Sequence, residues 1–167
     1  MRTAICPGSF DPVTNGHLDI FCRASVLFDE VVVLVMPNLE KKPSFTVEER
    51  VDMIRRVTTE LPNVRVDSHY GLIADYVKKE NAVAIVKGLR AVTDFEYEFQ
   101  MAITNKKLYH KAETVFLTTS LENMYVSSSL VKTVARFGGD VRRFVPDLLI
   151  DQITDRLHYQ KKGAQEE

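Results

Sequence analysis

Hydrophobic residues along the chain fall into two alternating patterns. Short continuous apolar runs, as at residues 3–6 and 31–36, are typical of strands buried on both faces of a parallel sheet. Between them, apolar residues recur every three or four positions, as at Leu18, Phe21 and Ala24, which indicates an amphipathic helix. This alternation predicts an α/β fold in which right-handed crossovers build a doubly wound, five-stranded parallel sheet.

The remaining elements follow the same alternation. Further strands are expected at residues 64–66, 82–86 and 114–117. Further helices are expected to begin near Thr46, Gly71, Asp94, Ser127 and Pro146. No linker or internal repeat divides the chain, so we expect one domain over residues 1–160, followed by a polar C-terminal tail over residues 161–167.

The stretch from residue 7 to residue 17 separates the first strand from the first helix. It contains two prolines and two glycines, which exclude a regular helix or strand there. Thr14 or Asn15 is expected to cap the helix that follows. Such a turn directs backbone N–H groups and the positive end of a helix at the space above the strand. The sequence therefore predicts an anion site at this turn.

Composition narrows the possible partners. The chain has 167 residues, of which 27% are charged, and a net charge of −1, so nothing points to nucleic acid or to an anionic membrane. No apolar run approaches the roughly 18 residues of a membrane span, and the N-terminus lacks the basic-then-apolar pattern of a secretion signal, so we expect a cytoplasmic location. Cys6 and Cys22 are expected to be reduced core residues.

Polar side chains gather where the predicted strands end. These side chains are Ser9 and His17 after the first strand, Lys41 after the second, Lys87 and Arg90 after the fourth, and Ser127, Ser128 and Ser129 after the fifth. Parallel strands end at one edge of a sheet, so cations and helix N-termini there predict a polyphosphate pocket. Neither common nucleotide loop, GxxxxGK(S/T) or GxGxxG, is present.

Several short strings, which occur in the family's order along the chain, carry a family resemblance. TNGH at 14–17 is similar to the (H/T)xGH signature of the nucleotidylyltransferase superfamily, and VSSS at 126–129 is similar to its second signature, ISS(S/T). The longer strings PGSFDPVTNGH, KGLRAVTDFEYE and SSSLVK resemble those of bacterial phosphopantetheine adenylyltransferases. The resemblance implies a Rossmann-like nucleotidyltransferase fold. It also implies reversible transfer of an adenylyl group from ATP to 4′-phosphopantetheine, giving dephospho-coenzyme A and pyrophosphate with Mg²⁺ as cofactor.

The resemblance also assigns roles to individual residues. The attacking group is a phosphate whose second pKa is about 6, so the reaction needs charge neutralisation and in-line alignment rather than a general base. The implied catalytic residues are His17, Lys41 and Arg90. The implied ATP-binding residues are Ser9, Phe10, His17, Gly88, Leu89, Arg90, Glu98, Asn123, Met124, Tyr125, Val126, Ser127, Ser128 and Ser129. The implied residues for the acceptor substrate are Ser9, Lys41, Ile73, Lys87 and Asn105.

One residue departs from the family pattern. The family usually has Arg where this chain has Lys87, and Lys lacks the two-pronged hydrogen bonding of a guanidinium, so a weaker hold on the acceptor phosphate is expected. The resemblance further implies a homohexamer, with the aromatic-rich helix around Phe95 as a plausible contact, and coenzyme A as a feedback inhibitor.

Two other functions compete with this interpretation. One is a transferase of the same superfamily that acts on nicotinate mononucleotide, or that uses CTP on a polyol phosphate. Those relatives tend to carry His where this chain has Thr14, and they lack the GLR string. The other is a non-catalytic nucleotide sensor on the same fold. Intact His17, Lys41, Arg90 and Ser129 disfavour it, because a sensor has no need of a transition-state donor.

Overall fold

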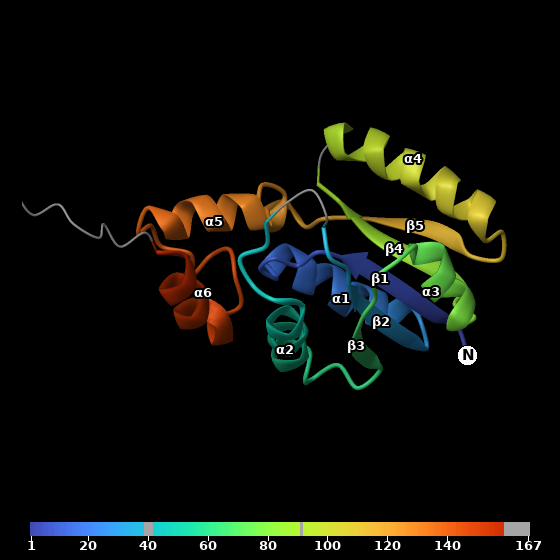
Figure 1. Cartoon of the computed structure of the whole chain (residues 1–167), viewed down its shortest axis with the longest axis horizontal. Coiled ribbons are helices and arrows are strands. Elements are labelled where there is room, and N and C mark those ends of the chain that lie inside the picture. The colour runs from blue at the N-terminus through green and yellow to red at the C-terminus, as the bar shows by residue number, and fades with distance from the viewer. Residues whose placement is uncertain (39–41, 91, 159–167) are drawn as a thin grey trace, which may run out of the picture.

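A computed structural model describes residues 1–38, 42–90 and 92–158. Its five strands form one sheet in the order β3-β2-β1-β4-β5, and every neighbouring pair is parallel (Figure 1). The strands are β1 (Thr3–Gly8), β2 (Glu30–Val35), β3 (Val64–Ser68), β4 (Ala84–Leu89) and β5 (Glu113–Thr118). The order places β1 between β2 and β4, which confirms the predicted doubly wound sheet.

Helices cover both faces of the sheet. They are α1 (Asn15–Leu27), α2 (Val47–Val57), α3 (Ile73–Lys79), α4 (Val92–Leu108), α5 (Ser128–Arg136) and α6 (Ile150–Leu157), with single 3₁₀ turns at η1 (Leu121–Asn123) and η2 (Asp147–Leu149). Figure 1 shows α3 and α4 on one side of the sheet and α1, α2 and α6 on the other. No helix in the described ranges is long and apolar enough to cross a membrane.

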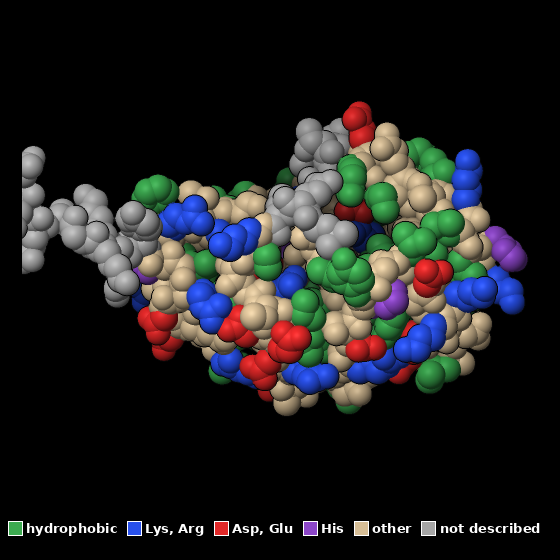
Figure 2. Space-filling view, viewed as in Figure 1, with side chains coloured by type: hydrophobic (Ala, Val, Ile, Leu, Met, Phe, Trp, Pro, Cys, Tyr) green, Lys and Arg blue, Asp and Glu red, His purple; other side chains and the backbone are tan. Residues whose placement is uncertain are grey.

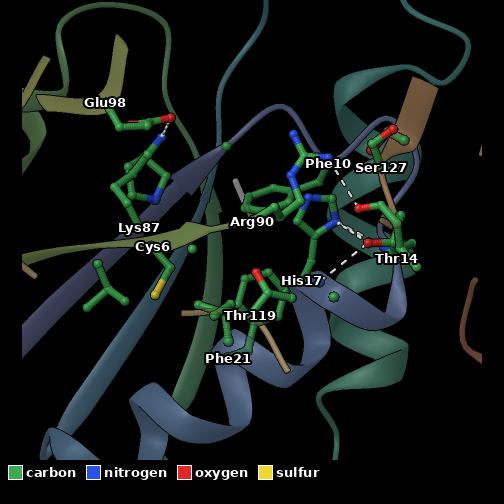
Figure 3. Close-up of a pocket in the computed structure, with 18 of the residues that line it drawn as sticks. Cys6, Phe10, Thr14, His17, Phe21, Lys87, Arg90, Glu98, Thr119 and Ser127 are labelled. Carbon is green, nitrogen blue, oxygen red and sulfur yellow. Dashed lines mark hydrogen bonds and ion pairs between the residues drawn. The ribbon is translucent and has the colours of Figure 1, made fainter. Parts of the chain in front are cut away.

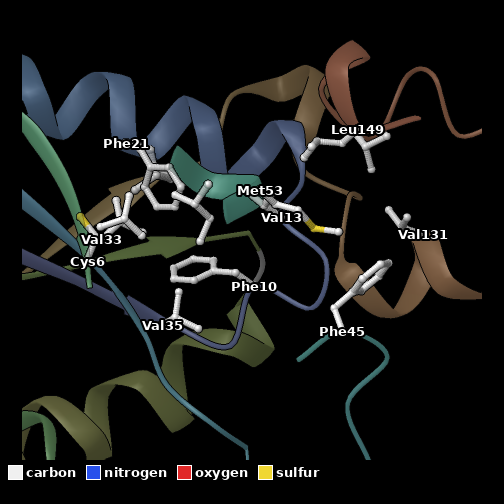
Figure 4. Close-up of a cluster of buried hydrophobic side chains, with 14 of the residues drawn as sticks. Cys6, Phe10, Val13, Phe21, Val33, Val35, Phe45, Met53, Val131 and Leu149 are labelled. Carbon is white, nitrogen blue, oxygen red and sulfur yellow. The ribbon is translucent and has the colours of Figure 1, made fainter. Parts of the chain in front are cut away.

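Strand β2 shows why the continuous apolar runs are needed. Val31, Val33 and Val35 belong to a buried cluster that also holds side chains from α1, α2, α5 and α6 (Figure 4). The alternate residues Val32 and Leu34 belong to a second cluster on the opposite face, with side chains from α3. Because successive strand residues point to opposite faces, a strand with helices on both sides must be apolar throughout.

Element boundaries differ from the predicted ones mainly at β4. The strand continues to Leu89, three residues past the predicted end, and Lys87 and Gly88 pair with Phe116 and Leu117 of β5. A Lys-Gly pair is a poor strand former, but pairing with a neighbouring strand overrides local preference. The consequence is that Lys87 stands in a rigid strand rather than in the loop after it.

Some residues lie elsewhere than expected. Cys6 is a free, buried cysteine as predicted, but Cys22 is free and exposed on α1, so its assignment to the core was wrong. The predicted tail at residues 161–167 lies outside the described residues.

Candidate active site

A cavity of about 490 Å³ opens where β1 and β4 end side by side (Figure 3). This is the switch point of the sheet, since the chain leaves β1 toward β2 on one side, while β4 and β5 lie on the other. Several predicted site residues line the cavity together: Phe10, His17, Lys87, Gly88, Arg90, Glu98, Val126, Ser127, Ser128 and Ser129. Residues between positions 10 and 129 of the sequence thus share one cavity, as the strand-end argument requires.

His17 is held by the cap of its own helix. Thr14 is the N-cap of α1, and its hydroxyl accepts a hydrogen bond from the His17 backbone N–H at 3.4 Å. In return, the Thr14 backbone N–H donates to Nδ1 of His17 at 3.0 Å. His17 therefore takes the place of Glu in a capping box. Because Nδ1 accepts this bond, the ring proton of neutral His17 lies on Nε2.

The surroundings keep His17 neutral. Burial, as the largest cause, and the positive charges of Arg90 and Lys87 together lower the pKa of His17 to about 4. The phenyl ring of Phe10 packs edge-on against the imidazole at 5.0 Å between centroids. A neutral imidazole with its proton on Nε2 can donate one hydrogen bond to an anion, but it is a poor base at neutral pH.

Phe10 adopts an unusual backbone conformation below the imidazole. Its φ is +50°, in the left-handed region that non-glycine residues rarely occupy. The centroid of its ring is 5.3 Å from that of Phe21. A Cβ atom added to Gly8 would stand 2.6 Å from Cζ of the Phe10 ring. Gly8 is therefore needed for the ring to lie under His17.

Asp11 joins three parts of the site, and the sequence pattern gave no indication of this role. Its buried carboxylate accepts hydrogen bonds from the backbone N–H groups of Ser44 and Phe45, the latter at 2.9 Å. It also pairs with the Lys132 ammonium of α5 at 2.7 Å. The carboxylate thus ties the turn after β1 to the segment before α2 and to the helix that follows the serines.

The N-terminus of α5 is anchored on the same turn. Ser127 caps this helix by accepting from the Leu130 N–H at 3.1 Å, and the Ser128 hydroxyl donates to the Pro12 carbonyl at 2.7 Å. Arg90 donates to the Val126 carbonyl at 3.2 Å. The positive ends of α1 and α5 therefore border one cavity, an arrangement that suits an anion.

Lys87 and Glu98 form an ion pair on the opposite wall. Their Nζ and Oε1 atoms are 3.2 Å apart, and Figure 3 shows Lys87 pointing toward Glu98 rather than His17. Both residues also line a smaller adjoining cavity of about 110 Å³, together with Ile73 and Asn105. The structure thus groups Ile73, Lys87 and Asn105, three of the residues predicted for the acceptor.

The other predicted residues lie around these cavities. Leu89 and Met124 line a neighbouring apolar pocket with Arg90, and Asn123 packs beside Gly16. Tyr125 packs edge-on against Phe144 at 6.1 Å. Ser9 lies between Gly8 and Phe10, which both line the main cavity. The predicted catalytic Lys41 lies outside the described residues.

Comparison with known proteins places the chain among nucleotidyltransferases. The cytidylyltransferase-like family matches residues 5–134. The chain is 50% identical over 164 residues to a phosphopantetheine adenylyltransferase of Dictyoglomus thermophilum, covering 98% of this chain and 100% of the relative. It is 57% identical over 157 residues to that of Streptomyces coelicolor, covering 94% and 98%.

A solved structure shows the same fold at low identity. The nicotinic acid mononucleotide adenylyltransferase of Plasmodium falciparum, complexed with NaAD, superposes with a TM-score of 0.72 at 16% identity, over 95% of this chain and 97% of that chain. At this identity the likeness concerns the fold alone.

Proposed function

This chain belongs to the phosphopantetheine adenylyltransferases of the cytidylyltransferase-like family, and we propose that it transfers the adenylyl group of ATP to 4′-phosphopantetheine. The products are dephospho-coenzyme A and pyrophosphate, and the reaction is reversible. The observation that carries the proposal is the site geometry. A neutral His17, fixed as an Nε2–H donor, stands with Lys87 and Arg90 in one cavity at the switch point of the sheet.

The reaction is an in-line displacement at the α-phosphorus. An oxygen of the acceptor phosphate forms the new P–O bond, and the bond from the α-phosphorus to the bridging oxygen of pyrophosphate breaks. The acceptor phosphate is already ionised near pH 7, so no base need remove a proton. His17 donates from Nε2 to an α-phosphoryl oxygen, where negative charge builds in the transition state.

The cationic and N–H groups around His17 bind the triphosphate. Arg90, held against the Val126 carbonyl, presents a guanidinium that suits bidentate contact with phosphate oxygens. The N-termini of α1 and α5 and the serine hydroxyls of 127–129 supply further donors. Ser9 and the Phe10 amide bind phosphate oxygens from the turn after β1.

The acceptor is proposed to occupy the side of the cavity that Lys87 lines. Its phosphate binds Lys87 and Lys41, and its pantetheine arm extends into the small cavity lined by Ile73 and Asn105. Glu98 lies between the two cavities, so it can orient Lys87 and contact the nucleotide. Support for this division is that Lys87 and Glu98 line both cavities.

Mg²⁺ is proposed to be held by the phosphates of ATP. In the described part of the chain, no three His, Cys, Asp or Glu side chains stand close enough together to hold a metal ion. Glu98 is the one carboxylate that lines the main cavity there, and it is paired with Lys87. This donor set fits Mg²⁺ that would arrive bound to the triphosphate and would neutralise part of its negative charge.

A homohexamer is also proposed. Exposed aromatic and aliphatic side chains follow one side of α4, with Phe95 42%, Phe99 48% and Ile103 45% exposed. On the other side of α4, Figure 2 shows further hydrophobic side chains gathered between this helix and α3. Such a patch supports self-association, and the number six rests on the family resemblance. Light scattering should show an oligomer that Phe99→Asp disrupts, whereas a monomeric unmodified chain would refute this proposal.

Two further proposals follow from the family resemblance. Coenzyme A shares the adenylyl group and the pantetheine arm of the product, so it should compete with ATP for the same cavity. A cytoplasmic location suits the two free cysteines, Cys6 and Cys22, because thiols stay reduced there.

A panel of acceptors tests the proposed activity. Pyrophosphate release should be measured with ATP and 4′-phosphopantetheine, with ATP and nicotinate mononucleotide, and with CTP and a polyol phosphate. Release only in the first mixture is the expected result. Release only in another mixture would identify a different transferase, and ATP binding without release in any mixture would indicate a sensor.

A further inference from the structure

Arg50 is a fully buried arginine that packs against the turn after β1. It lies on α2, and 2% of its surface is exposed. Its Nη1 donates to the carbonyl of Ser9 at 2.8 Å and approaches the Ser9 hydroxyl at 3.4 Å. Its Nε donates to the Thr46 carbonyl at 3.1 Å. The guanidinium therefore joins the first turn of α2 to the residue at the tip of β1.

No carboxylate forms an ion pair with Arg50 within the parts of the chain that the structure describes. Asp11 and Glu48 are near enough to raise the pKa of Arg50, but burial is the larger effect and lowers it. The Asp11 carboxylate is already engaged by Lys132 at 2.7 Å. Arg50, Asp11 and Lys132 together thus carry one excess positive charge beneath the turn, and the further carboxylate that acts on Arg50, that of Glu48, is exposed to solvent. A buried charge without a counter-ion destabilises a fold, so its presence calls for a role.

The bond to the Ser9 carbonyl fixes the direction of the next amide. The Ser9 C=O and the Phe10 N–H belong to one planar peptide group and point in opposite directions. Since the carbonyl points at Arg50, the Phe10 N–H points away from it. No acceptor for that N–H is found among the described residues. The same peptide precedes the strained φ of +50° at Phe10, a conformation that the Arg50 bond helps to hold.

We infer that Arg50 is a positioning residue for the nucleotide phosphates. It holds the Ser9–Phe10 peptide with its N–H presented to an anion, and it occupies a lone pair of the Ser9 hydroxyl so that this O–H also donates outward. The bound phosphates supply the negative charge that the buried cluster lacks. The identity of the anion as ATP rests on the proposed function, whereas the geometry of the donors does not.

Two substitutions at Arg50 separate this role from simple packing. Arg50→Met removes the charge and the donors but fills similar volume, and Arg50→Lys keeps the charge but loses the fork that reaches both carbonyls. Because Arg50→Met also removes a buried uncompensated charge, it should unfold at a temperature no lower than Arg50→Lys. ATP affinity, measured by calorimetry without acceptor, should instead fall more in Arg50→Met than in Arg50→Lys. We expect a loss of about tenfold or more for Arg50→Met and a smaller loss for Arg50→Lys.

Arg65→Lys is the matched control. Arg65 also bonds several groups, but they are the carboxylates of Glu30 and Glu80 and the Tyr76 hydroxyl, away from the cavity. This variant should lose stability without losing ATP affinity. If Arg50→Met does not fold, the comparison of Arg50→Lys with Arg65→Lys decides, since only the former should bind ATP more weakly.

Several outcomes would overturn the inference. These are ATP affinity in Arg50→Met within twofold of the unmodified protein, affinity losses that follow the loss of thermal stability in all three variants, or no ATP binding by the unmodified protein. If the unmodified protein binds ATP but releases no pyrophosphate with any acceptor, the proposed function fails. The role of Arg50 can still be tested in that case, because it depends only on the ATP affinity of each variant relative to that of the unmodified protein.

Discussion

The Thr14 backbone N–H donates to Nδ1 of His17 across 3.0 Å, and this bond determines what the imidazole can do. It leaves Nε2 as the protonated nitrogen, and the lowered pKa of about 4 keeps the ring neutral. At pH 7, nitrogen NMR of the imidazole should therefore show a neutral ring protonated at Nε2, with a titration midpoint near 4. A midpoint near 6.5, or a proton on Nδ1, would contradict this assignment.

The same lowered pKa makes stability depend on pH. Between pH 6.5 and about 4 the unfolded chain binds a proton at His17 that the native chain does not, so this residue reduces stability as the pH falls through that window. Denaturant unfolding at several pH values should show a smaller decline over this range in His17→Asn than in the unmodified protein. Identical declines would mean that the native pKa of His17 is not depressed.

His17→Ala should affect turnover far more than nucleotide binding. In the proposed mechanism the Nε2 donor acts on charge that develops in the transition state, so its removal should lower kcat by about 10²–10³-fold, as for other oxyanion donors. ATP affinity should change only modestly, because Arg90 and the helix N-termini remain. Steady-state kinetics and calorimetry measure the two effects. Unchanged kcat with a large loss of ATP affinity would show that His17 binds rather than stabilises the transition state.

Gly8→Ala should damage the site through Phe10. The new methyl group would stand 2.6 Å from the Phe10 ring, which must then move from beneath the imidazole. Overpacking of this kind typically destabilises a fold by 1–3 kcal/mol, so a loss of about 2 kcal/mol is expected, together with a lower kcat. The control is Gly16→Ala, where the nearest atom outside the local backbone would be 3.6 Å away. Equal losses of kcat in both variants would contradict this account.

Asp11→Asn should destabilise the protein by leaving Lys132 without its partner. Breaking a buried ion pair from one side destabilises by roughly 3–5 kcal/mol, and about 3 kcal/mol is expected here because Lys132 keeps some solvent contact. Asp11→Asn combined with Lys132→Met should recover part of this loss. Urea unfolding of the single and double variants measures the coupling, and strictly additive losses would show that the pair is not coupled.

Local sequence patterns were sufficient to predict the sheet and the residues that meet at its edge. The apolar runs at β1, β2 and β5, and the capping motif at Thr14, depend on neighbours in sequence, so their positions could be predicted. Strand ends of a parallel sheet share an edge, which is why His17, Lys87, Arg90 and the serines could be grouped without coordinates.

The features that were missed depend on contacts between distant residues. Arg50 and Asp11 look like ordinary surface charges in sequence, and only packing of α2 and α5 against the first turn buries them. The Lys87–Glu98 ion pair joins β4 to α4, so it lacks the i, i+4 spacing by which an ion pair within one helix can be predicted from sequence. Cys22 directly follows the buried Phe21 in sequence, but it lies on the exposed side of α1, which only the packing of the helix against the sheet determines.

Lys87→Arg should strengthen binding of the acceptor, 4′-phosphopantetheine. The ammonium of Lys87 is 3.2 Å from Glu98, so in the proposed mechanism a single ammonium group would have to bond both this carboxylate and the acceptor phosphate. A guanidinium has five donors in a planar fork and can bond a carboxylate and a phosphate at the same time. The KM for 4′-phosphopantetheine should therefore fall, while the KM for ATP changes little because Arg90 and the helix N-termini are untouched. Lys87→Met provides the opposite control and should raise the acceptor KM. If Lys87→Arg leaves that KM unchanged or raises it, then Lys87 does not limit acceptor binding.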